Sequence, residues 1–250
     1  MNQSVATMAL PVPPASMLDA AALFLDFDGT LVELADTPGD IQVRPELPPL
    51  LRRLSERLQG RVAIISGRAI ADLERHLDCA GLGVSGSHGL ELRLASGVLI
   101  PLAARSAVDA VRDEVHLFAN AVPELLVEEK PASIAVHFRQ APDEAFRVEQ
   151  FLSKLALRHD LALQAGKMVL ELRPKGADKG DALRAFMTEP PFAGARPIFV
   201  GDDMTDEDAF EAAAALGGAG ILVGPARPTA AQWRLANVDA VAAWLRGGAG

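Results

Sequence analysis

The sequence predicts an α/β protein with a doubly wound, Rossmann-like parallel sheet that is interrupted by an inserted α+β module. Short apolar runs alternate with amphipathic helical stretches over residues 21–89 and again over residues 173–250. Continuous apolar runs of this kind are typical of parallel strands buried on both faces. Residues 90–172 show hairpin signals instead. We therefore expect a core domain of residues 21–89 and 173–250, and a second domain of residues 90–172.

The first part of the core is expected to alternate strands with helices. Buried strands are expected at residues 21–31, 61–68 and 83–89, where each short apolar run ends in Gly or small polar residues. Helices are expected at residues 45–58 and 69–77. In the first of these, leucines recur at the spacing of one helix face. This order predicts parallel βαβ units.

The inserted domain has a different pattern. Two hairpins are expected at residues 91–102 and 125–139, strand-like sequence with a Gly-Lys turn at 161–174, and helices at 107–121 and 143–158. Hairpins mixed with helices are typical of an antiparallel sheet covered by helices.

The alternation of strands and helices resumes after the insert. Helices are expected at residues 179–187 and 206–216, strands at 197–203 and 219–224, and a closing helix at 229–245. The parallel sheet is therefore completed by the second half of the chain.

Composition excludes several classes of protein. Hydrophobic residues make up 50% and charged residues 23% of the 250-residue chain, as in a folded globular protein. The net charge of −9 argues against nucleic-acid binding. One cysteine, Cys79, excludes a disulfide framework and a thiolate zinc site. Residues 1–20 are expected to be a flexible leader without signal-peptide character, so we expect a cytoplasmic monomer with no membrane partner.

The negative charge is concentrated in two blocks. Residues 1–43 and residues 197–226 contain no Lys or Arg, and each block holds six acidic residues. Together the blocks carry more negative charge than the net −9 of the chain. Each block follows or contains an apolar run. Strands formed by these runs would place the acidic residues of both blocks at an edge of the sheet.

Four polar motifs lie at expected strand ends or helix starts. They are Asp26-Phe27-Asp28-Gly29-Thr30, Ser66-Gly67-Arg68, Lys179-Gly180-Asp181, and Gly201-Asp202-Asp203 with Asp206. Ligands of parallel α/β sheets bind beyond the carboxyl ends of the strands. Each motif alone also fits an ordinary turn or helix start, and we assign Glu207 and Asp208 mainly to a helix N-terminus. The combination favours one shared site.

The residue types in these motifs suit phosphoryl transfer. Asp26 and Asp28 are two residues apart, and adjacent carboxylates repel unless a cation or proton intervenes. Hard oxygen ligands, completed by Asp202, favour Mg²⁺. Gly29 allows backbone amides to approach an anion, Ser66 offers a hydroxyl and Lys179 a positive charge.

The four motifs resemble those of the haloacid dehalogenase (HAD) phosphatase superfamily. The matching segments are DFDGTL, ISGR, the Lys of GADKGDAL, and GDDMTDEDAF. The resemblance implies that Asp26 attacks phosphorus to form an aspartyl-phosphate, and that Asp28 acts as general acid and then general base. It implies phosphate binding by Gly29, Thr30, Ser66, Gly67 and Lys179. It also implies Mg²⁺ binding by Asp26, the Asp28 carbonyl and Asp202, with support from Asp203 and Asp206.

The insert narrows the resemblance to the trehalose-6-phosphate phosphatases. The segments concerned are GSHGLELR, VEEKPASIAVHFR and GKMVLELRPKGADKG. The resemblance implies a cap domain and hydrolysis of trehalose 6-phosphate to trehalose and phosphate, the final step of trehalose biosynthesis. It implies a sugar site formed by Glu128, Lys130 and Glu171. His88 and Arg139 are further candidates for contacts with the substrate or the phosphate, and His88 also fits a turn held by backbone hydrogen bonds.

Strand alternation agrees with part of this assignment. It places Glu128 and Lys130 on one face and Glu129 on the other. From the residues alone, Glu128 to Lys130 also fits a solvated hairpin, and His137 is expected to face the cap sheet or to pack structurally.

Two alternatives remain at this point. One is a phosphatase with the same cap that acts on another sugar phosphate, such as sucrose phosphate or mannosyl phosphoglycerate. The other is a catalytically inactive regulator that binds a sugar phosphate. The intact set of Asp26, Asp28, Ser66, Lys179 and Asp202 argues against the inactive regulator.

Overall fold

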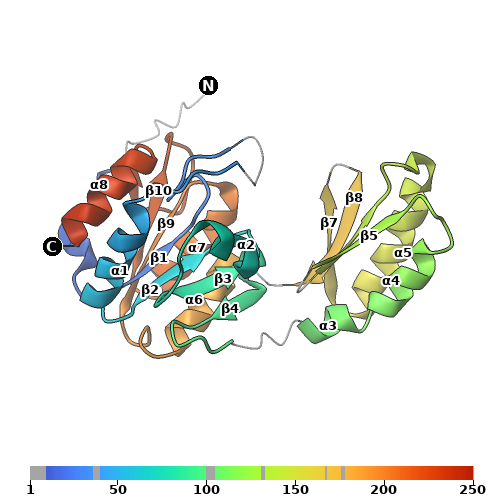
Figure 1. Cartoon of the computed structure of the whole chain (residues 1–250), viewed down its shortest axis with the longest axis horizontal. Helices are drawn as coiled ribbons and strands as arrows, with labels where there is room; N and C mark the ends of the chain where they lie inside the picture. The colour runs from blue at the N-terminus through green and yellow to red at the C-terminus, as the bar shows by residue number, and fades with distance from the viewer. Residues whose placement is uncertain are drawn as a thin grey trace, which may run out of the picture. The chain divides into compact units, whose positions relative to one another are not determined.

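The computed structural model describes residues 10–35, 40–99, 105–130, 133–166, 168–175 and 178–249. The chain divides into two compact units (Figure 1). The core unit comprises Met1–Ile100 and Asp178–Gly250, and the cap unit comprises Pro101–Ala177. Each unit has its own sheet and its own buried apolar cluster. No helix in the described residues is long and apolar enough to cross a bilayer.

The core unit is built on a seven-stranded sheet. Its strands, in spatial order, are β11 (Trp233–Leu235), β10 (Ala219–Val223), β9 (Arg196–Gly201), β1 (Ala21–Leu25), β2 (Val62–Ile65), β3 (Gly83–Gly86) and β4 (Glu91–Arg93). All neighbours are parallel except β3 and β4. The chain runs outward from β1 on one side and from β9 on the other, so the topological switch point lies between these two strands.

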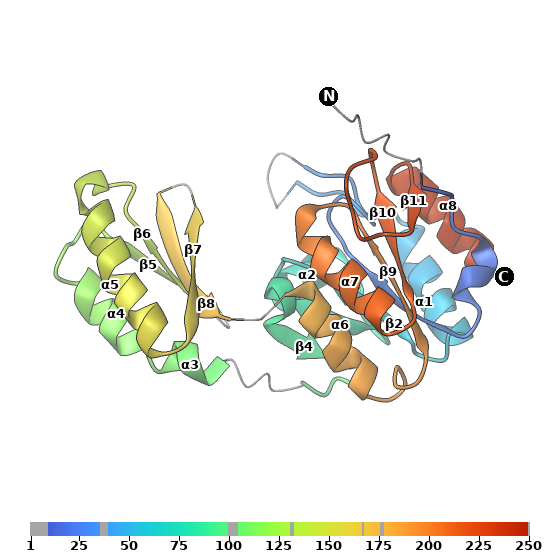
Figure 2. The ribbon, with the colours of Figure 1, turned by 180° about the vertical axis from the view of Figure 1, so that it is seen from behind.

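Helices cover both faces of this sheet (Figures 1 and 2). On one face lie α1 (Leu47–Arg57), α2 (Ile70–His76) and α8 (Val238–Gly248), and on the other lie α6 (Lys179–Thr188) and α7 (Glu207–Ala215). Alternate residues of β1 serve the two faces, because Leu23 packs in the α1 and α8 cluster whereas Phe24 packs against Phe186 of α6. The central strands β1 and β2 are buried along their whole length, which explains their continuous apolar sequence.

Residues 10–20 are anchored to the core unit at several points although Val12 is exposed, unlike the flexible leader expected to extend to residue 20. A short 3₁₀ helix at Ala15–Leu18 buries Met17 and Leu18. The Trp244 indole donates to the Pro14 carbonyl at 3.4 Å, and the Arg234 amide donates to the Pro11 carbonyl at 2.9 Å. Met17 and Leu18 therefore belong to the core cluster, and the carbonyls of Pro11 and Pro14 hold the segment against it.

The hairpin expected at residues 91–102 was assigned to the inserted domain, but its first strand belongs to the core sheet. The turn at Gly97 forms, with its amide on the Leu94 carbonyl at 2.9 Å. However, β4 pairs antiparallel with β3 and buries Leu92, so it extends the core sheet. The unit boundary consequently lies at residue 100 instead of 90.

Two expected helices are interrupted. The helix expected at 107–121 is split into α3 (Arg105–Asp109) and α4 (Arg112–Ala119). The closing helix expected at 229–245 begins only at Val238, because Trp233–Leu235 pairs with β10.

The cap unit has a four-stranded antiparallel sheet. Its order is β5 (Leu126–Lys130), β6 (Ser133–His137), β8 (Val169–Pro174) and β7 (Leu161–Gly166). Val136 and Leu170 pack with α3, α4 and α5 (Ala145–Arg158) on one face. Glu128 and Glu171 both lie level with Ala135 in the strand register, on the opposite face.

A cluster of three phenylalanines stabilises the α6 face of the core. Phe24, Phe186 and Phe192 have no exposed surface, and their ring centroids lie 5.1 to 5.8 Å apart. We expect Phe186→Ala to lower the free energy of unfolding by about 3–5 kcal/mol, since it removes a buried ring and leaves a cavity. Urea denaturation followed by tryptophan fluorescence measures this, because both tryptophans, Trp233 and Trp244, lie in the core unit.

The matched control is Val12→Ala, at a core-unit position that is 71% exposed. It should change stability by less than about 0.5 kcal/mol. Equal effects of the two substitutions would contradict the assignment of the aromatic cluster to the core.

Candidate functional site

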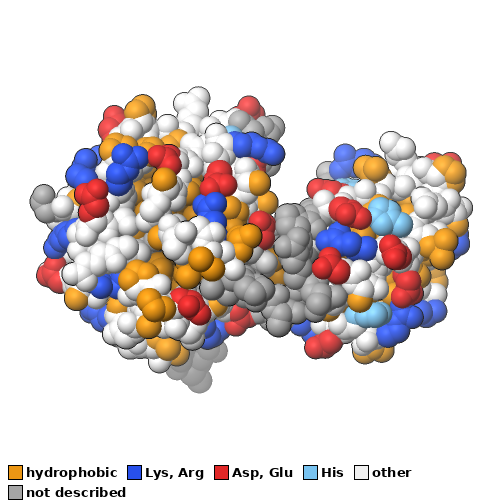
Figure 3. Space-filling model, turned by 60° about the horizontal axis from the view of Figure 1, so that its bottom comes forward, with side chains coloured by type: hydrophobic (Ala, Val, Ile, Leu, Met, Phe, Trp, Pro, Cys, Tyr) orange, Lys and Arg blue, Asp and Glu red, His pale blue; other side chains and the backbone are white. Residues whose placement is uncertain are grey.

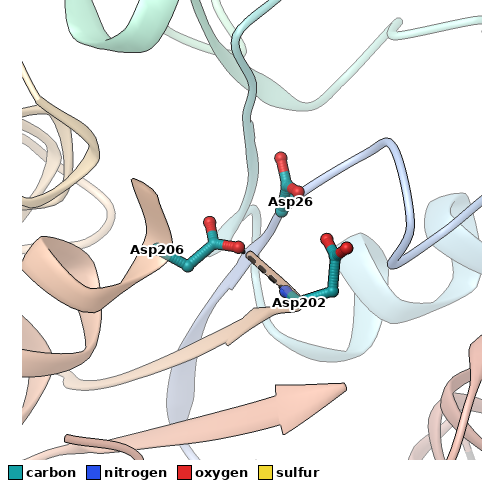
Figure 4. A group of neighbouring side chains, drawn as sticks. All are labelled: Asp26, Asp202 and Asp206. Carbon is teal, nitrogen blue, oxygen red and sulfur yellow. Dashed lines mark hydrogen bonds between the residues drawn. The ribbon is translucent and has the colours of Figure 1, made fainter. Parts of the chain in front are cut away.

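The two acidic blocks meet where β1 and β9 end. These strands pair in parallel with Leu25 opposite Val200, and Asp26 and Asp202 follow them. Carboxylate oxygens of Asp26, Asp202 and Asp206 all lie within 4.8 Å of one another (Figure 4). Parallel strands with this register bring together residues 176 positions apart, so the cluster depends on the sheet.

Lys179 provides a buried positive charge within this cluster. Its Nζ lies 2.9 Å from Asp26 Oδ1 and 2.7 Å from Asp206 Oδ1, and its side chain is 3% exposed. The residue begins α6, whose N-cap Asp178 accepts a hydrogen bond from the Asp181 amide. Burial acts to lower the pKa of Lys179, but the two carboxylates outweigh burial and raise it.

Asp206 organises the loop that carries Asp202. Its Oδ2 accepts hydrogen bonds from the amides of Asp202, at 2.8 Å, and Asp203, at 3.0 Å, while Oδ1 binds Lys179. The side chain has no exposed surface, and burial raises the pKa of Asp206 to about 6 against the opposing effect of Lys179. Both oxygens are occupied, so Asp206 positions the loop (Figure 4).

Asp26 and Asp202 fit the role of cation ligands. Their carboxylates point to the same side in Figure 4. Burial is the main cause that raises the pKa of both groups, followed by the negative charges of Asp206 and Asp203 respectively. Gly29 makes room for this arrangement, because a Cβ there would lie 2.1 Å from Asp202 Oδ2. Crowded, buried oxygen donors with excess negative charge suit a hard divalent cation.

Asp28 is bound by an arginine that sequence reasoning left without a role. Arg68 donates from Nε to Asp28 Oδ2 at 2.6 Å and from Nη2 to Oδ1 at 2.8 Å. It also donates from Nη1 to Asp72 Oδ2 at 2.9 Å. This two-point contact fixes the plane of the Asp28 carboxylate. In the sequence, a role for Arg68 in the site was indicated by its position directly after Ser66-Gly67.

Ser66, Gly67 and His88 form the next wall of the site. The buried Ser66 hydroxyl accepts from the Arg68 amide at 3.1 Å, and the His88 amide donates to the Ser66 carbonyl at 3.0 Å. His88 has a φ of 55°, and a Cβ at Gly67 would lie 2.6 Å from its Nε2. The strained His88 backbone therefore holds the imidazole over Gly67.

These residues line one pocket of about 370 Å³ within the core unit. Its lining consists of Asp26, Asp28, Leu34, Ser66, Gly67, Arg68, Asp72, His88, Lys179, Asp202, Asp203 and Thr205. Gly29 and Thr30 lie instead against Asp202, whose Oδ1 accepts from the Thr30 hydroxyl at 3.3 Å. Asp203 accepts from the Thr205 amide and hydroxyl at 2.8 and 2.7 Å, so it caps the turn that leads into α7.

The cap unit presents a polar sheet face of its own. Glu128 Oε2 lies 2.8 Å from His137 Nε2, and the Ser133 hydroxyl donates to Glu171 Oε1 at 2.5 Å. Figure 3 shows acidic, basic and histidine side chains side by side on the surface of the cap unit that faces the viewer, and the sheet-face contacts above belong to individual residues of β5, β6 and β8. Sequence reasoning missed the pairing of His137 with Glu128, although both alternate onto this face.

Glu129, Lys130 and Arg139 lie at three different places in the cap unit. Glu129 faces the helices, where its carboxylate lies 2.7 Å from His116 Nε2. The Lys130 backbone pairs with Ser133 in register with the polar face, and its side chain lies outside the described part of the structure. Arg139 lies exposed in the turn after β6.

Comparisons with known proteins agree on one family. A family model described as trehalose-phosphatase matches residues 24–239. The chain is 40% identical over 232 residues to a probable trehalose-phosphate phosphatase of Sinorhizobium fredii, covering 92% of this chain and 86% of that one. It is 37% identical over 231 residues to trehalose-6-phosphate phosphatase of Escherichia coli, covering 90% and 85%.

A solved structure shares the fold over nearly the whole chain. The C-terminal domain of trehalose-6-phosphate phosphatase from C. albicans aligns with a TM-score of 0.67 and 26% identity, covering 96% of this chain and 98% of that one. The expected α/β fold class is confirmed by this likeness.

The carboxylate cluster predicts proton-coupled cation binding. Because the pKa of Asp206 is about 6 and those of Asp26 and Asp202 are raised, protons compete with a divalent cation as the pH falls. Affinity should decrease from about pH 7.5 to about pH 5.5, and more protons should be released per bound cation at the lower pH. Calorimetric titration in buffers of different ionisation enthalpy measures both. Affinity that is constant over this range would contradict the prediction.

Proposed function

The chain belongs to the trehalose-phosphatase family, and we propose that its core site hydrolyses trehalose 6-phosphate to trehalose and phosphate through an aspartyl-phosphate. Hydrolysis of a phosphoric monoester is the activity for which its curated relatives are named. The single observation that best supports the mechanism is the contact of Lys179 with Asp26 at the end of β1. It provides a buried nucleophile with a fixed positive charge beside it.

Asp26 is proposed as the nucleophile. One carboxylate oxygen attacks phosphorus, the new O–P bond forms, and the bond from phosphorus to the sugar oxygen breaks. Lys179, 2.9 Å from Asp26, offsets negative charge on the phosphoryl oxygens. The Ser66 hydroxyl and the Gly67 backbone complete phosphate binding from the adjacent wall of the pocket.

Asp28 is proposed as the proton carrier. It donates a proton to the departing sugar oxygen and then removes a proton from the water that attacks the aspartyl-phosphate, which releases phosphate and restores Asp26. Arg68 occupies both oxygens of Asp28 in this structure. One of these contacts therefore opens when substrate binds, while the contact of Arg68 with Asp72 keeps the guanidinium nearby.

The cation proposed for this site is Mg²⁺. Asp26, the backbone carbonyl of Asp28 and Asp202 would hold it, with Asp203 and Asp206 shaping the loop, and it would supply positive charge to the phosphoryl group. The oxygen-only donor set and the excess of buried carboxylates support this choice over softer metals.

Sugar recognition is proposed for the polar face of the cap sheet. Glu128 and Glu171 alternate onto this face, Lys130 occupies the backbone position two residues after Glu128 in β5, and Arg139 follows β6. Carboxylates accept hydrogen bonds from sugar hydroxyls, and His137 and Ser133 orient the two glutamates for this purpose. His88 is proposed to contact the phosphate end of the substrate, since it lines the core pocket.

Asp26→Asn should lower turnover by roughly 10⁴-fold or more while the protein stays folded, because an amide cannot form the phosphoryl-enzyme. Phosphate release and thermal melting measure the two effects. In the companion variant Asp28→Asn, mass spectrometry after acid quenching should detect a phosphorylated protein when the substrate is p-nitrophenyl phosphate, because its phenolate departs without a proton from Asp28 whereas breakdown of the intermediate is slowed. Normal turnover in Asp26→Asn would disprove the nucleophile assignment.

Glu171→Gln should lower kcat/KM for trehalose 6-phosphate roughly 10–100-fold, the effect of losing a charged hydrogen-bond acceptor. Activity on p-nitrophenyl phosphate, which has no sugar, should be nearly unchanged. The matched control is Glu129→Gln on the opposite sheet face, which should spare both substrates. Equal losses of kcat/KM on the two substrates would contradict a role of Glu171 in sugar recognition.

A panel of sugar phosphates tests the substrate itself. Trehalose 6-phosphate should give the highest kcat/KM in a set that includes sucrose phosphate and mannosyl phosphoglycerate. A higher value for another member would assign that substrate instead. Saturable binding without phosphate release in Mg²⁺ would indicate an inactive sugar-phosphate receptor.

A further inference from the structure

We propose that Arg227 is a positioning residue that sets the cation affinity of the core site by holding the backbone of the Asp202–Asp203 loop. The inference rests on the cation site of the proposed function. Arg227 lies in the segment after β10, outside the four motifs, and its side chain is 21% exposed. It does not line the pocket that contains Asp26 and Asp202.

The guanidinium of Arg227 contacts the loop through backbone carbonyls. Its Nη2 donates to the Asp203 carbonyl at 2.6 Å and to the Asp202 carbonyl at 3.3 Å. Its Nη1 forms an ion pair with Glu207 and donates to the Pro228 carbonyl at 3.3 Å. One rigid fork therefore joins the loop to the start of α7.

The same two loop residues are held from the other direction by Asp206. Asp206 Oδ2 accepts from the amides of Asp202 and Asp203, whereas Arg227 donates to their carbonyls. Amides and carbonyls of both residues are thus fixed by buried or half-buried charges. The Asp202 carboxylate is the proposed ligand carried by this clamped backbone, so its position depends on both contacts.

Glu207 anchors the arginine. Its Oε2 accepts from the Thr229 hydroxyl at 3.1 Å and from the Ala230 amide at 2.8 Å, so the segment is tied to α7 at Arg227 and again at residues 229–230. Glu207 is 18% exposed and lies at the first residue of α7. Its role therefore exceeds the favourable charge at a helix N-terminus that the sequence predicted.

The positive charge of Arg227 and its contacts with the loop predict opposite effects on cation affinity when the residue is removed. Arg227 adds positive charge near a cation site, so if charge alone mattered its removal would strengthen cation binding. If positioning matters, its removal weakens binding, because the Asp202 ligand loses its fixed backbone. Arg227→Lys keeps the charge but cannot reproduce the fork, and it separates the two effects.

The experiment is calorimetric titration of Mg²⁺ into the substrate-free full chain and its variants. Arg227→Met and Arg227→Lys should both raise the dissociation constant for Mg²⁺, by roughly 10–100-fold for the Met variant. The Mg²⁺ concentration for half-maximal activity should rise in parallel, while KM for trehalose 6-phosphate at saturating Mg²⁺ stays within about twofold. The control is Arg184→Met, which breaks an exposed ion pair with Asp181 and should alter neither constant.

An unchanged or lowered dissociation constant in both variants would overturn the proposal, even if thermal stability fell. Should Arg227→Met fail to fold, Glu207→Gln provides a second test, with a smaller increase expected because the carbonyl contacts remain. The titration needs no turnover. Failure of the proposed function would appear as no phosphate release by the wild-type chain, whereas failure of this inference would appear as unchanged Mg²⁺ affinity.

Discussion

The contact between Lys179 and two buried carboxylates is the interaction on which the rest of the site depends. Three aspartates with oxygens within 4.8 Å would repel strongly in a buried site, and Lys179 offsets part of that charge. The lysine reaches both carboxylates from the start of α6, because Asp26 directly follows β1 and Asp206 lies in the 3₁₀ turn Met204–Asp206 after β9. The doubly wound order of strands is therefore what makes the charge cluster possible.

Close packing around this cluster restricts the residues beside it. A Cβ at Gly201 would lie 2.3 Å from the Asp206 carboxyl carbon, so the last residue of β9 must leave space for the side chain that organises the loop. The same reasoning applies to Gly29 beside Asp202. Glycines thus mark where charged groups approach the backbone, and a side chain there would displace the carboxylate of Asp202 or Asp206.

Much of this site could be predicted from the sequence, because its residues follow apolar runs. Asp26 and Asp202 were expected at strand ends and lie there. The pairs Arg68–Asp28 and Arg227–Glu207 could not be predicted, since arginines in loops carry no periodic signal and their partners are chosen by tertiary packing. The same limit applies to β4. Its hairpin turn could be predicted from Ser96-Gly97, but its pairing with β3 could not, because that pairing depends on which edge of the sheet is free.

The partners of the aspartates distinguish their roles more clearly than sequence order does. Asp28 is bound by Arg68, Asp203 by Thr205, and Asp206 by Lys179 and two amides. Each of these carboxylates is oriented by a specific donor. Asp26 contacts Lys179 at 2.9 Å and Asp202 accepts from the Thr30 hydroxyl at 3.3 Å, yet the pKa values of both are raised, mainly by burial. Stability alone would not select this arrangement, and under the proposed function a bound cation and a phosphoryl group would offset its electrostatic cost.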